Sequence, residues 1–303
     1  MSEKRKVMPA ADLTPTLFDM GVDVPKGQCV EPEFAIPGVR LGTSAFTAAG
    51  WPGSFYPANM NPRDYLSYYA TKFNSVEIDS TFYACPPADR FKRWYEATPP
   101  DFVFALKVPQ SITHEKCLLD CEKEFDEFVG RAKLLEDKLG PLVLQFGHFT
   151  REQFETPLVF FNRLRSFLQN AKGTSCRFAV EIRNKEWLTA EFAGLLRDHG
   201  VALALQDRTW MQLPSIMAFD YVTTDFSYVR LLGDRRGIER QTKVWDKEIV
   251  DRTTELTSWV NVCQRIVERG VSLYVYINNH YSGHAPATVA QFVKLWNGGI
   301  DNP

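Results

Sequence analysis

Long apolar runs are missing from this sequence. No stretch approaches the roughly 18 consecutive apolar residues that cross a membrane as a helix. The N-terminal MSEKRKVMPAADL also lacks the apolar segment of a secretory signal. We therefore expect a protein that has no membrane partner and resides in the cytoplasm.

Closely spaced cysteine pairs are missing too. The cysteines form no CxxC motif, and Cys117 and Cys121, four residues apart, make only a weak metal-binding pattern. Reduced thiols in a cytoplasmic protein are the simplest interpretation. The cysteines are Cys29, Cys85, Cys117, Cys121, Cys176 and Cys263.

The sequence has neither an excess of one charge sign nor a glycine-rich phosphate loop. It contains 35 lysines and arginines against 37 acids, which gives a formal net charge of −2. No global basic field therefore indicates nucleic acid as a partner, although a local basic patch is compatible with this balance. Because no glycine-rich loop follows a predicted strand, a dinucleotide-binding fold is disfavoured.

Residues 1–36 differ from the rest of the 303-residue chain. Prolines recur through this segment, at Pro9, Pro15, Pro25 and Pro32, and hydrophobic periodicity is weak. This composition predicts an N-terminal extension that is loosely ordered or packed on the folded part. Residues 37–303 are predicted to form a single domain.

From Val39 onward, short β-like runs alternate with amphipathic stretches. This alternation predicts a parallel sheet, and its eight repeats predict closure into a single TIM-type (β/α)₈ barrel of the α/β class. A doubly wound open sheet is the alternative, and no helix is evident over 208–227. The predicted strands are 39–44, 75–79, 103–107, 142–145, 177–183, 201–207, 228–232 and 273–278. The predicted helices are 62–72, 88–97, 122–137, 158–169, 190–199, 246–268 and 285–296.

Each predicted strand has an aliphatic face and a face that becomes polar where the strand ends. In 75–79, Val76 and Ile78 share one parity, while Glu77 and Asp79 share the other. In a barrel, one parity packs under the helices and the other points inward. Charges late in parallel strands therefore converge at the C-terminal mouth, where (β/α)₈ enzymes carry out their chemistry. The polar residues assigned to the mouth in this way are Ser44, Glu77, Asp79, Lys107, Gln145, Glu181, Arg183, Asp207, Arg230 and Asn278.

A purely structural interpretation of these charges is an ion-pair network that closes the barrel. Buried ion pairs stabilise a fold poorly compared with apolar packing. Their number therefore favours a ligand site over a network that serves stability alone. In the structural interpretation, Glu77, Asp79, Glu181 and Asp207 neutralise Lys107, Arg183 and Arg230.

The chain resembles the YecE-like family, domain of unknown function 72, whose members have a (β/α)₈ barrel. The resemblance covers nearly all of residues 39–296 and implies the fold, but no settled activity. Leu232 stands where the family often has histidine, and His280 and His284 are the nearby imidazole candidates. The segments that carry the resemblance are LGTS (41–44), GWPGSFYP (50–57), FNSVEIDSTFY (73–83), TPPDFVFALKVPQSITH (98–114), KLGPLVLQF (138–146), AVEIRNKEWL (179–188), YVRLLGD (228–234) and YVYINNHYSGHAPATV (274–289).

The mouth residues suggest acid–base chemistry on an anion. Glu77 and Glu181 are the candidate general acid and base, because paired carboxylates divide these roles when their surroundings differ. Lys107 is a candidate cation or Schiff-base nucleophile. His114 is a proton shuttle, a metal ligand or a hydrogen-bond partner within its loop. Arginine offers forked donors for carboxylate or phosphate. The further candidate ligand-binding residues are Ser44, Asp79, Tyr83, Gln145, Arg183, Trp187, Asp207, Arg230, Asn278, Asn279 and His280, with Tyr276 and Tyr281 as additional stacking candidates.

No cofactor is expected. The weaker alternative is a divalent metal, because mixed histidine and carboxylate sets bind zinc or manganese, but no HExxH spacing supports it. Its ligands would come from Glu77, His114, Glu181, Asp207 and His280.

Three functions fit this pattern, and the oligomeric state stays open. The first is an enzyme that uses carboxylate acid–base chemistry on an anionic small molecule, phosphorylated or sugar-like. The second is a nucleic-acid phosphodiesterase, metal-assisted or not, which predicts a basic rim from Arg235, Arg236, Arg240 and Lys243. The third is a binding protein that holds its ligand without turnover.

Overall fold

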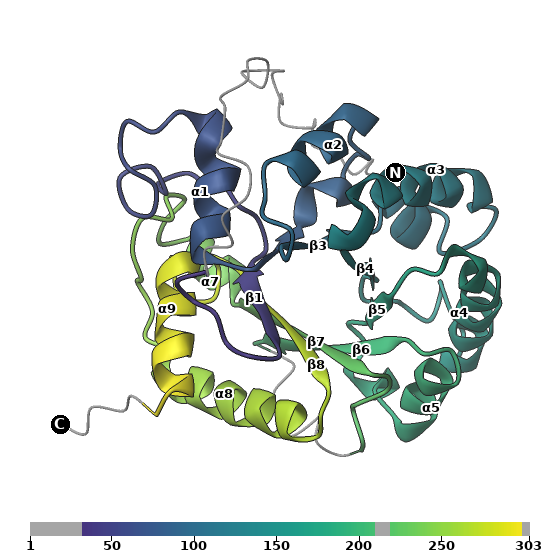
Figure 1. Cartoon of the computed structure of the whole chain (residues 1–303). Helices are drawn as coiled ribbons and strands as arrows, with labels where there is room; N and C mark the ends of the chain where they lie inside the picture. Colours follow the sequence, from purple (N-terminus) through teal and green to yellow (C-terminus); the bar gives the residue numbers. More distant parts are fainter. Residues whose placement is uncertain (1–31, 210–218, 299–303) are drawn as a thin grey trace, which may run out of the picture.

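Eight parallel strands surrounded by helices form a nearly closed barrel in the computed structural model, which describes residues 32–209 and 219–298 (Figure 1). Each predicted strand run coincides with an observed strand to within a few residues, so the barrel prediction is confirmed. The strands are β1 Val39–Thr43, β2 Ser75–Ile78, β3 Val103–Lys107, β4 Leu139–Gln145, β5 Phe178–Glu181, β6 Ala202–Arg208, β7 Phe226–Gly233 and β8 Ser272–Ile277.

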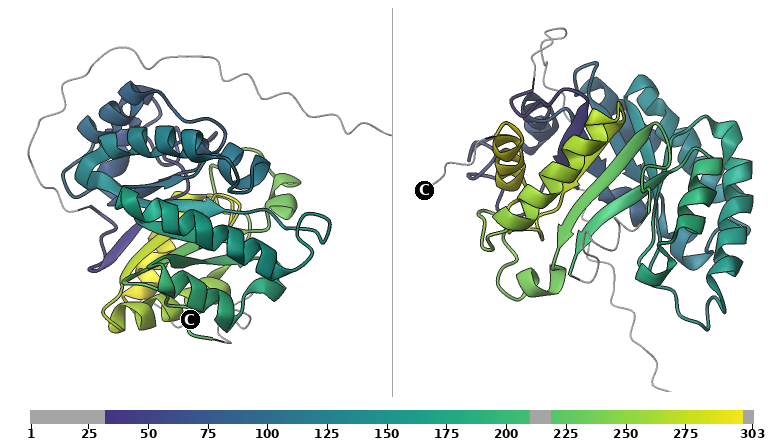
Figure 2. Two further views of the ribbon diagram at one scale, coloured as in Figure 1. Left: turned by 90° about the vertical axis from the view of Figure 1, so that its right-hand side faces the viewer. Right: turned by 90° about the horizontal axis from the view of Figure 1, so that it is seen from below.

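The helices lie outside the strands in all views (Figures 1 and 2). No helix of the described residues is long and apolar enough to cross a membrane. The α-helices are α1 Tyr65–Lys72, α2 Ala88–Glu96, α3 Glu122–Ala132, α4 Pro157–Ala171, α5 Ala190–Asp198, α7 Arg235–Glu239, α8 Thr253–Glu268 and α9 Ala285–Trp296.

Two helix predictions need correction, and one observed helix has no predicted counterpart. The helix expected over 246–268 begins only at Thr253, because the amides of Ile249 and Val250 donate to the Ser282 carbonyl instead of entering a helix. The helix expected over 122–137 leaves α geometry after Ala132 and continues as a 3₁₀ turn. The short helix α7 was not expected. In the crossover over 208–227, residues 210–218 lie outside the described residues.

The predicted extension, 1–36, is described only from residue 32 onward. There, the amides of Glu33 and Phe34 donate to the carbonyls of Thr71 and Lys72 at the end of α1. The Phe34 ring stacks on Phe73 at 5.5 Å between centroids. The last residues of the extension therefore pack on the outside of the barrel.

The strand order is β1-β8-β7-β6-β5-β4-β3-β2, which leaves β1 and β2 as the two edges of one rolled sheet. Among the described residues no backbone hydrogen bond joins these edges. Side chains join them instead: Asn74 accepts from the Leu41 amide at 2.8 Å and donates to the Val39 carbonyl at 2.9 Å. The Tyr69 hydroxyl accepts from the Thr43 amide at 2.8 Å. We call this contact the β1–β2 seam.

Glycine is required at the seam. A Cβ atom on Gly42 would lie 1.9 Å from the Ser75 carbonyl oxygen, which no side chain tolerates. The absence of a side chain at this position lets β1 approach β2 closely enough for the barrel to close.

Alternation along the strands separates two apolar regions, as the parity pattern predicts. The aliphatic parity, for example Val76 and Ile78 of β2, belongs to the large cluster under the helices. The opposite parity forms a separate cluster inside the barrel. Because small residues alternate with aromatic rings there, the interior is filled. Its members are Val103, Ala105, Val143, Ala179, Ala202, Ala204, Phe226, Tyr228, Tyr274 and Tyr276.

Candidate functional site

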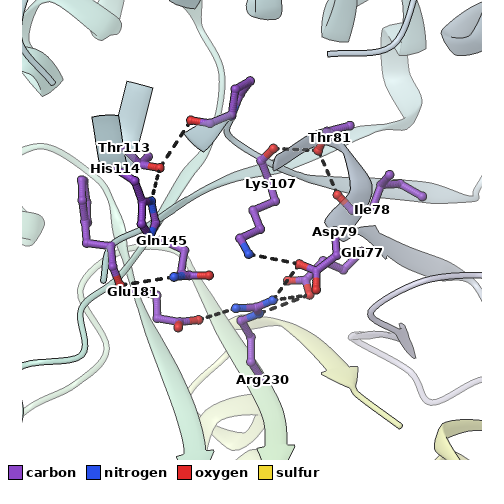
Figure 3. Close-up of polar contacts among 12 residues, drawn as sticks. Glu77, Ile78, Asp79, Thr81, Lys107, Thr113, His114, Gln145, Glu181 and Arg230 are labelled. Carbon is purple, nitrogen blue, oxygen red and sulfur yellow. Dashed lines mark hydrogen bonds and ion pairs between the residues drawn. The ribbon is translucent and has the colours of Figure 1, made fainter. Parts of the chain in front are cut away.

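A cluster of charged side chains lies above this apolar interior, towards the C-terminal ends of the strands, with Arg230 of β7 at its centre (Figure 3). Arg230 is 1% exposed. Its Nη2 donates to Glu77 Oε1 at 2.8 Å and to Asp79 Oδ1 at 3.1 Å, and its Nη1 donates to Glu181 Oε2 at 2.5 Å. One guanidinium thus joins carboxylates from opposite sides of the barrel.

Glu77 is completely buried beneath the mouth. Its Oε2 accepts from the Tyr228 hydroxyl at 2.6 Å, and its Oε1 accepts from Arg230. Burial raises the pKa of Glu77, and the charge of Arg230 opposes this rise.

Glu181 is equally buried but has a different electrostatic environment. Its Oε1 accepts from Arg208 at 3.2 Å and lies 3.9 Å from Arg183 Nε. Burial alone would raise its pKa, but Arg230, Arg208 and Arg183 outweigh burial and hold the pKa of Glu181 at about 2. Glu181 is therefore ionised at neutral pH, and the two glutamates have opposite pKa shifts.

Lys107, at the end of β3, extends over this layer towards Asp79 and Arg230 (Figure 3). Its Nζ lies 3.6 Å from Asp79 Oδ1 and 3.9 Å from the centroid of the Phe82 ring. The Lys107 carbonyl accepts from the Thr81 hydroxyl at 2.6 Å, which ties β3 to the turn after β2. Burial is the main cause that lowers the pKa of Lys107.

His114 borders the same cluster from the π-helical turn Ser111–Glu115 after β3. Its Nδ1 is 2.9 Å from the Thr113 hydroxyl, and its ring packs edge-on against Phe82. Burial, and then the positive charges of Lys107 and Arg183, lower the pKa of His114 to about 4. The imidazole is therefore neutral at pH 7.

Exposure divides these side chains into two levels. The side chains of Glu77 and Glu181 are 0% exposed and that of Arg230 is 2% exposed. The side chains of Asp79 and Arg183 are 33% and 31% exposed. A molecule at the mouth therefore meets the upper level first, and the side chains of Lys107 and Arg208, 10% and 13% exposed, lie between the two levels.

Among the described residues, three carboxylates in this cluster face four cations, which leaves one positive charge in excess when all seven are ionised. The carboxylates are Glu77, Asp79 and Glu181, and the cations are Lys107, Arg183, Arg208 and Arg230.

Asn278, Asn279 and His280 follow β8. The His280 ring bonds Asn278 through Nδ1 and lies 3.1 Å from Glu239 of α7 through Nε2. Asn279 Oδ1 accepts from the Ala285 amide at the start of α9 at 2.9 Å. These contacts hold the loop after β8 in place.

Several predicted mouth residues have other surroundings. Asp207 lies on the outward parity of β6 and accepts from Trp259 Nε1 of α8 at 2.9 Å, so its assignment to the mouth was wrong. Trp187 is 6% exposed and stacks on Phe149 within an aromatic core cluster, not on an open stacking wall. Tyr276 and Tyr281 are fully buried as well.

The remaining candidates lie near the strand ends. Tyr83 is 66% exposed and packs edge-on against Phe82. The Gln145 side chain donates to the Phe146 carbonyl at 3.3 Å. Ser44 is 3% exposed, and its hydroxyl has no hydrogen-bond partner within the described part of the chain.

The prediction from the sequence did not include three residues that belong to the site. Gln206 and Arg208 have the inward parity of β6, the parity of Ala202 and Ala204, and strict alternation from those alanines identifies both. Tyr228 looked like an ordinary interior aromatic residue, and no sequence signal indicated its bond to Glu77.

The five residues considered as metal ligands do not come together. Within residues 32–209 and 219–298, no group of three or more histidine, cysteine, aspartate or glutamate side chains is arranged to hold a metal ion. Glu77 and Glu181 are bound to Arg230, and Asp207 faces α8.

Comparison with known proteins places this barrel in a family. Residues 40–302 match the family described as protein of unknown function DUF72. The chain belongs to the DUF72 family. It is 39% identical over 126 residues to the UPF0759 protein YecE of Escherichia coli K12, which covers 40% of this chain and 42% of YecE. It is 30% identical over 145 residues to the UPF0759 protein YunF of Bacillus subtilis 168, which covers 46% of this chain and 49% of YunF. The chain thus matches less than half the length of these curated relatives.

Solved DUF72 structures share the barrel. The family protein of Thermotoga maritima MSB8 has a TM-score of 0.65 at 30% identity, over 86% of this chain and 99% of that one. The family protein of Enterococcus faecalis V583 has the same TM-score at 21% identity, over 88% of this chain and 98% of that one, a likeness of fold alone. Resemblance to DUF72 proteins is therefore confirmed in sequence and in structure.

Proposed function

We propose that this DUF72 barrel is an enzyme that binds an anionic small molecule, phosphorylated or sugar-like, at its C-terminal mouth and moves protons on it. The excess of cations over carboxylates in the mouth cluster carries this proposal. The buried Arg183 Nε supports it further, because it has no hydrogen-bond partner within the described residues and lies 3.9 Å from the nearest Glu181 oxygen. A ligand oxygen would satisfy this donor.

The cations of the mouth cluster fall into two groups, one that organises the site and one that has donors available for a ligand. Arg230 is enclosed by three carboxylates, so it organises the site and does not contact the ligand. Arg183 and Lys107 have longer ion pairs, at 3.9 and 3.6 Å, and their geometry leaves donors for an anion. Forked guanidinium donors suit phosphate and carboxylate groups equally.

Proton transfer is best served by the more exposed groups. Glu77 and Glu181 are too deep to contact a ligand at the mouth, and they support catalysis by holding Arg230. Asp79 and the neutral His114 border the upper level, where a general acid or base must lie to reach a bound molecule.

Saturable binding of phosphate tests this proposal. Inorganic phosphate should raise the melting temperature of the protein along a saturating curve, since a ligand that binds only the folded state stabilises it. Arg183→Gln should lose most of this gain. Arg177→Gln is the matched control, because Arg177 precedes β5 at the opposite end of the barrel, where it bonds Tyr274. A linear response, equal in all three proteins, would show a general salt effect and overturn the proposal.

A nucleic-acid substrate is the second candidate. Arg235, Arg236, Arg240 and Lys243 are all exposed in and after α7, which His280 links to the loop after β8. Phosphate-backbone binding would be lost steeply with rising salt and would weaken when these residues are neutralised. Salt-resistant binding of small anions favours the first proposal. Binding of such an anion without conversion of any member of a phosphosugar and sugar-acid panel would favour a binding protein.

A further inference from the structure

Two buried lysines in this protein have opposite surroundings. Lys138 is 4% exposed, and its Nζ donates to the Tyr95 carbonyl at 2.6 Å, to the Thr98 carbonyl at 2.7 Å and to the Thr98 hydroxyl at 3.3 Å. All three of its N–H groups have acceptors, as a buried ammonium requires. Lys138 thus has the contacts of a structural lysine whose ammonium form is fully hydrogen-bonded.

Lys107 is 8% exposed but has no such set of acceptors. Among the described residues, its Nζ has no hydrogen bond; its one ion pair, to Asp79, spans 3.6 Å. On one side it contacts the face of the Phe82 ring at 3.9 Å. Arg230, which bonds the same Asp79 oxygen, adds a like charge nearby. The ring face and Asp79 attract an ammonium, but without a hydrogen-bond acceptor among the described residues they hold it less firmly than the contacts of Lys138 do, and they leave the nitrogen lone pair of the neutral amine available.

We propose that Lys107 is a Schiff-base lysine, which condenses with the carbonyl group of an aldehyde or ketone that also bears an anionic group. This inference rests on the proposed function, since Arg183 must hold the anionic group while the carbonyl reaches the neutral amine of Lys107, which then no longer counts among the binding cations. It narrows the substrate class to anionic carbonyl compounds, such as a sugar phosphate in its open-chain form or a keto acid.

The condensation is balanced by groups at the site. The neutral amine of Lys107 attacks the carbonyl carbon, and a C–N bond forms as the C=O π bond breaks. The carbinolamine then loses its oxygen as water, with both hydrogens of that water supplied by the amine and relayed through acid–base groups. Asp79, whose Oδ1 lies 3.6 Å from Nζ, is placed to relay them. Protonation of the imine restores the positive charge beside Asp79.

Lysine activation of this kind has a physical basis in the site. A desolvated lysine beside another cation has a lowered pKa, and the neutral amine is the nucleophile. Burial, the largest cause, and Arg230 lower the pKa of Lys107, while Asp79, Glu181 and Glu77 oppose them without reversing the direction. Burial also lowers the pKa of Lys138, but each of its three N–H groups donates to an oxygen acceptor. These bonds require the ammonium form, in which the nitrogen has no free lone pair. Lys138 is therefore the internal control for burial without reactivity.

Reductive trapping tests the inference. The full-length protein is incubated at pH 7 with glyoxylate and sodium cyanoborohydride, which converts an imine into a stable carboxymethyl-lysine, and the modified peptides are mapped by mass spectrometry. Lys107 should be modified faster than the exposed lysines, because a lowered pKa raises the fraction of neutral amine at pH 7. Lys138 should stay unmodified, and Lys107→Arg should lose the fast modification.

Phosphate separates the two proposals without any variant. Protection of Lys107 from glyoxylate by phosphate supports both. Fast modification of Lys107 without protection would uphold the lysine assignment and overturn anion binding at this site. A saturable phosphate effect on melting, together with modification no faster at Lys107 than at exposed Lys243, would overturn the lysine assignment and leave the anion site standing.

Discussion

The two halves of the barrel interior are built on different principles. The N-terminal half is filled by small aliphatic and aromatic side chains, such as Ala105, Ala179 and Tyr274. The C-terminal half is filled by charges that surround Arg230. Apolar packing gains stability from each group buried, whereas a buried charge needs every partner in place. The comparison indicates that the first half stabilises the barrel through apolar packing, whereas the stability of the second half depends on a complete set of charge partners.

The largest expected effect comes from Arg230→Met. The substitution keeps an apolar stem but leaves Glu77 and Glu181 without their central cation. Removing one partner from a buried network typically costs about 3–5 kcal/mol. Urea unfolding at pH 7 should therefore show a loss of this size in the free energy of unfolding.

The matched variant adds Glu77→Gln and Glu181→Gln to Arg230→Met. If unpaired charge is the cause of the loss, the triple variant should regain part of the stability. A single variant as stable as the wild type would contradict the contrast between the halves, because the charged half would then tolerate the loss of its centre.

The next effect is the acid sensitivity of Glu181. Its pKa of about 2 in the folded protein lies below the ordinary value of 4.5, so the unfolded chain binds a proton first as the pH falls. The stabilisation is complete above pH ~4.5 and is lost as the pH falls towards 2; a shift of this size corresponds to about 3 kcal/mol.

Glu181→Gln should flatten this part of the stability curve, measured by urea unfolding between pH 5 and 2.5. Glu152→Gln, at an exposed turn, is the control and should leave the slope unchanged. An unchanged slope in Glu181→Gln would mean that Glu181 contributes nothing to acid sensitivity.

His114 provides the smallest test. Its pKa of about 4 lies below the ordinary 6.5, so between these values the unfolded chain binds a proton that the folded protein does not. Stability should fall as the pH falls from 6.5 towards 4. The contribution is about 1 kcal/mol, because solvent screens a half-buried group.

Urea unfolding at pH 7 and pH 5 should show a smaller difference in His114→Gln than in the wild type. The exposed His148 offers the control, and His148→Gln should behave like the wild type. Equal pH sensitivity in all three proteins would remove His114 from the cluster around Lys107.

The sequence predicts the apolar half of the barrel better than the charged half. The period-two alternation of Val76 and Ile78, or of Val229 and Leu231, depends only on which face is buried, and this is a local property. The same alternation gives the inward direction of Glu77, Lys107, Glu181 and Arg230. The alternation does not give the depth at which each side chain lies below the mouth. The sequence therefore does not show that Arg230 reaches Glu77 across the barrel, or that Asp79 lies nearer the solvent.

The errors at the site have physical causes. Asp207 was grouped by its late position in β6, although it shares the outward parity of Leu203 and Leu205, so position was given more weight than alternation. The helix before Thr253 was predicted from local composition, but the loop after β8 supplies a competing acceptor at Ser282. Contacts between segments distant in the chain decide both cases.

The β1–β2 seam has a consequence for how the barrel moves. At every other strand boundary, widening the barrel breaks a ladder of backbone hydrogen bonds, whereas at the seam it breaks side-chain bonds, such as those of Asn74 and Tyr69 and the bond of Ser75 to Tyr276 of β8. The strands at the seam end at Thr43 and Ile78, and Asp79, which follows β2 directly, belongs to the charged cluster. The seam is therefore the strand boundary at which the barrel mouth can change width while the fewest backbone hydrogen bonds break. Backbone amides at the β1–β2 seam, such as that of Leu41, should exchange with solvent deuterium sooner than those between β7 and β8.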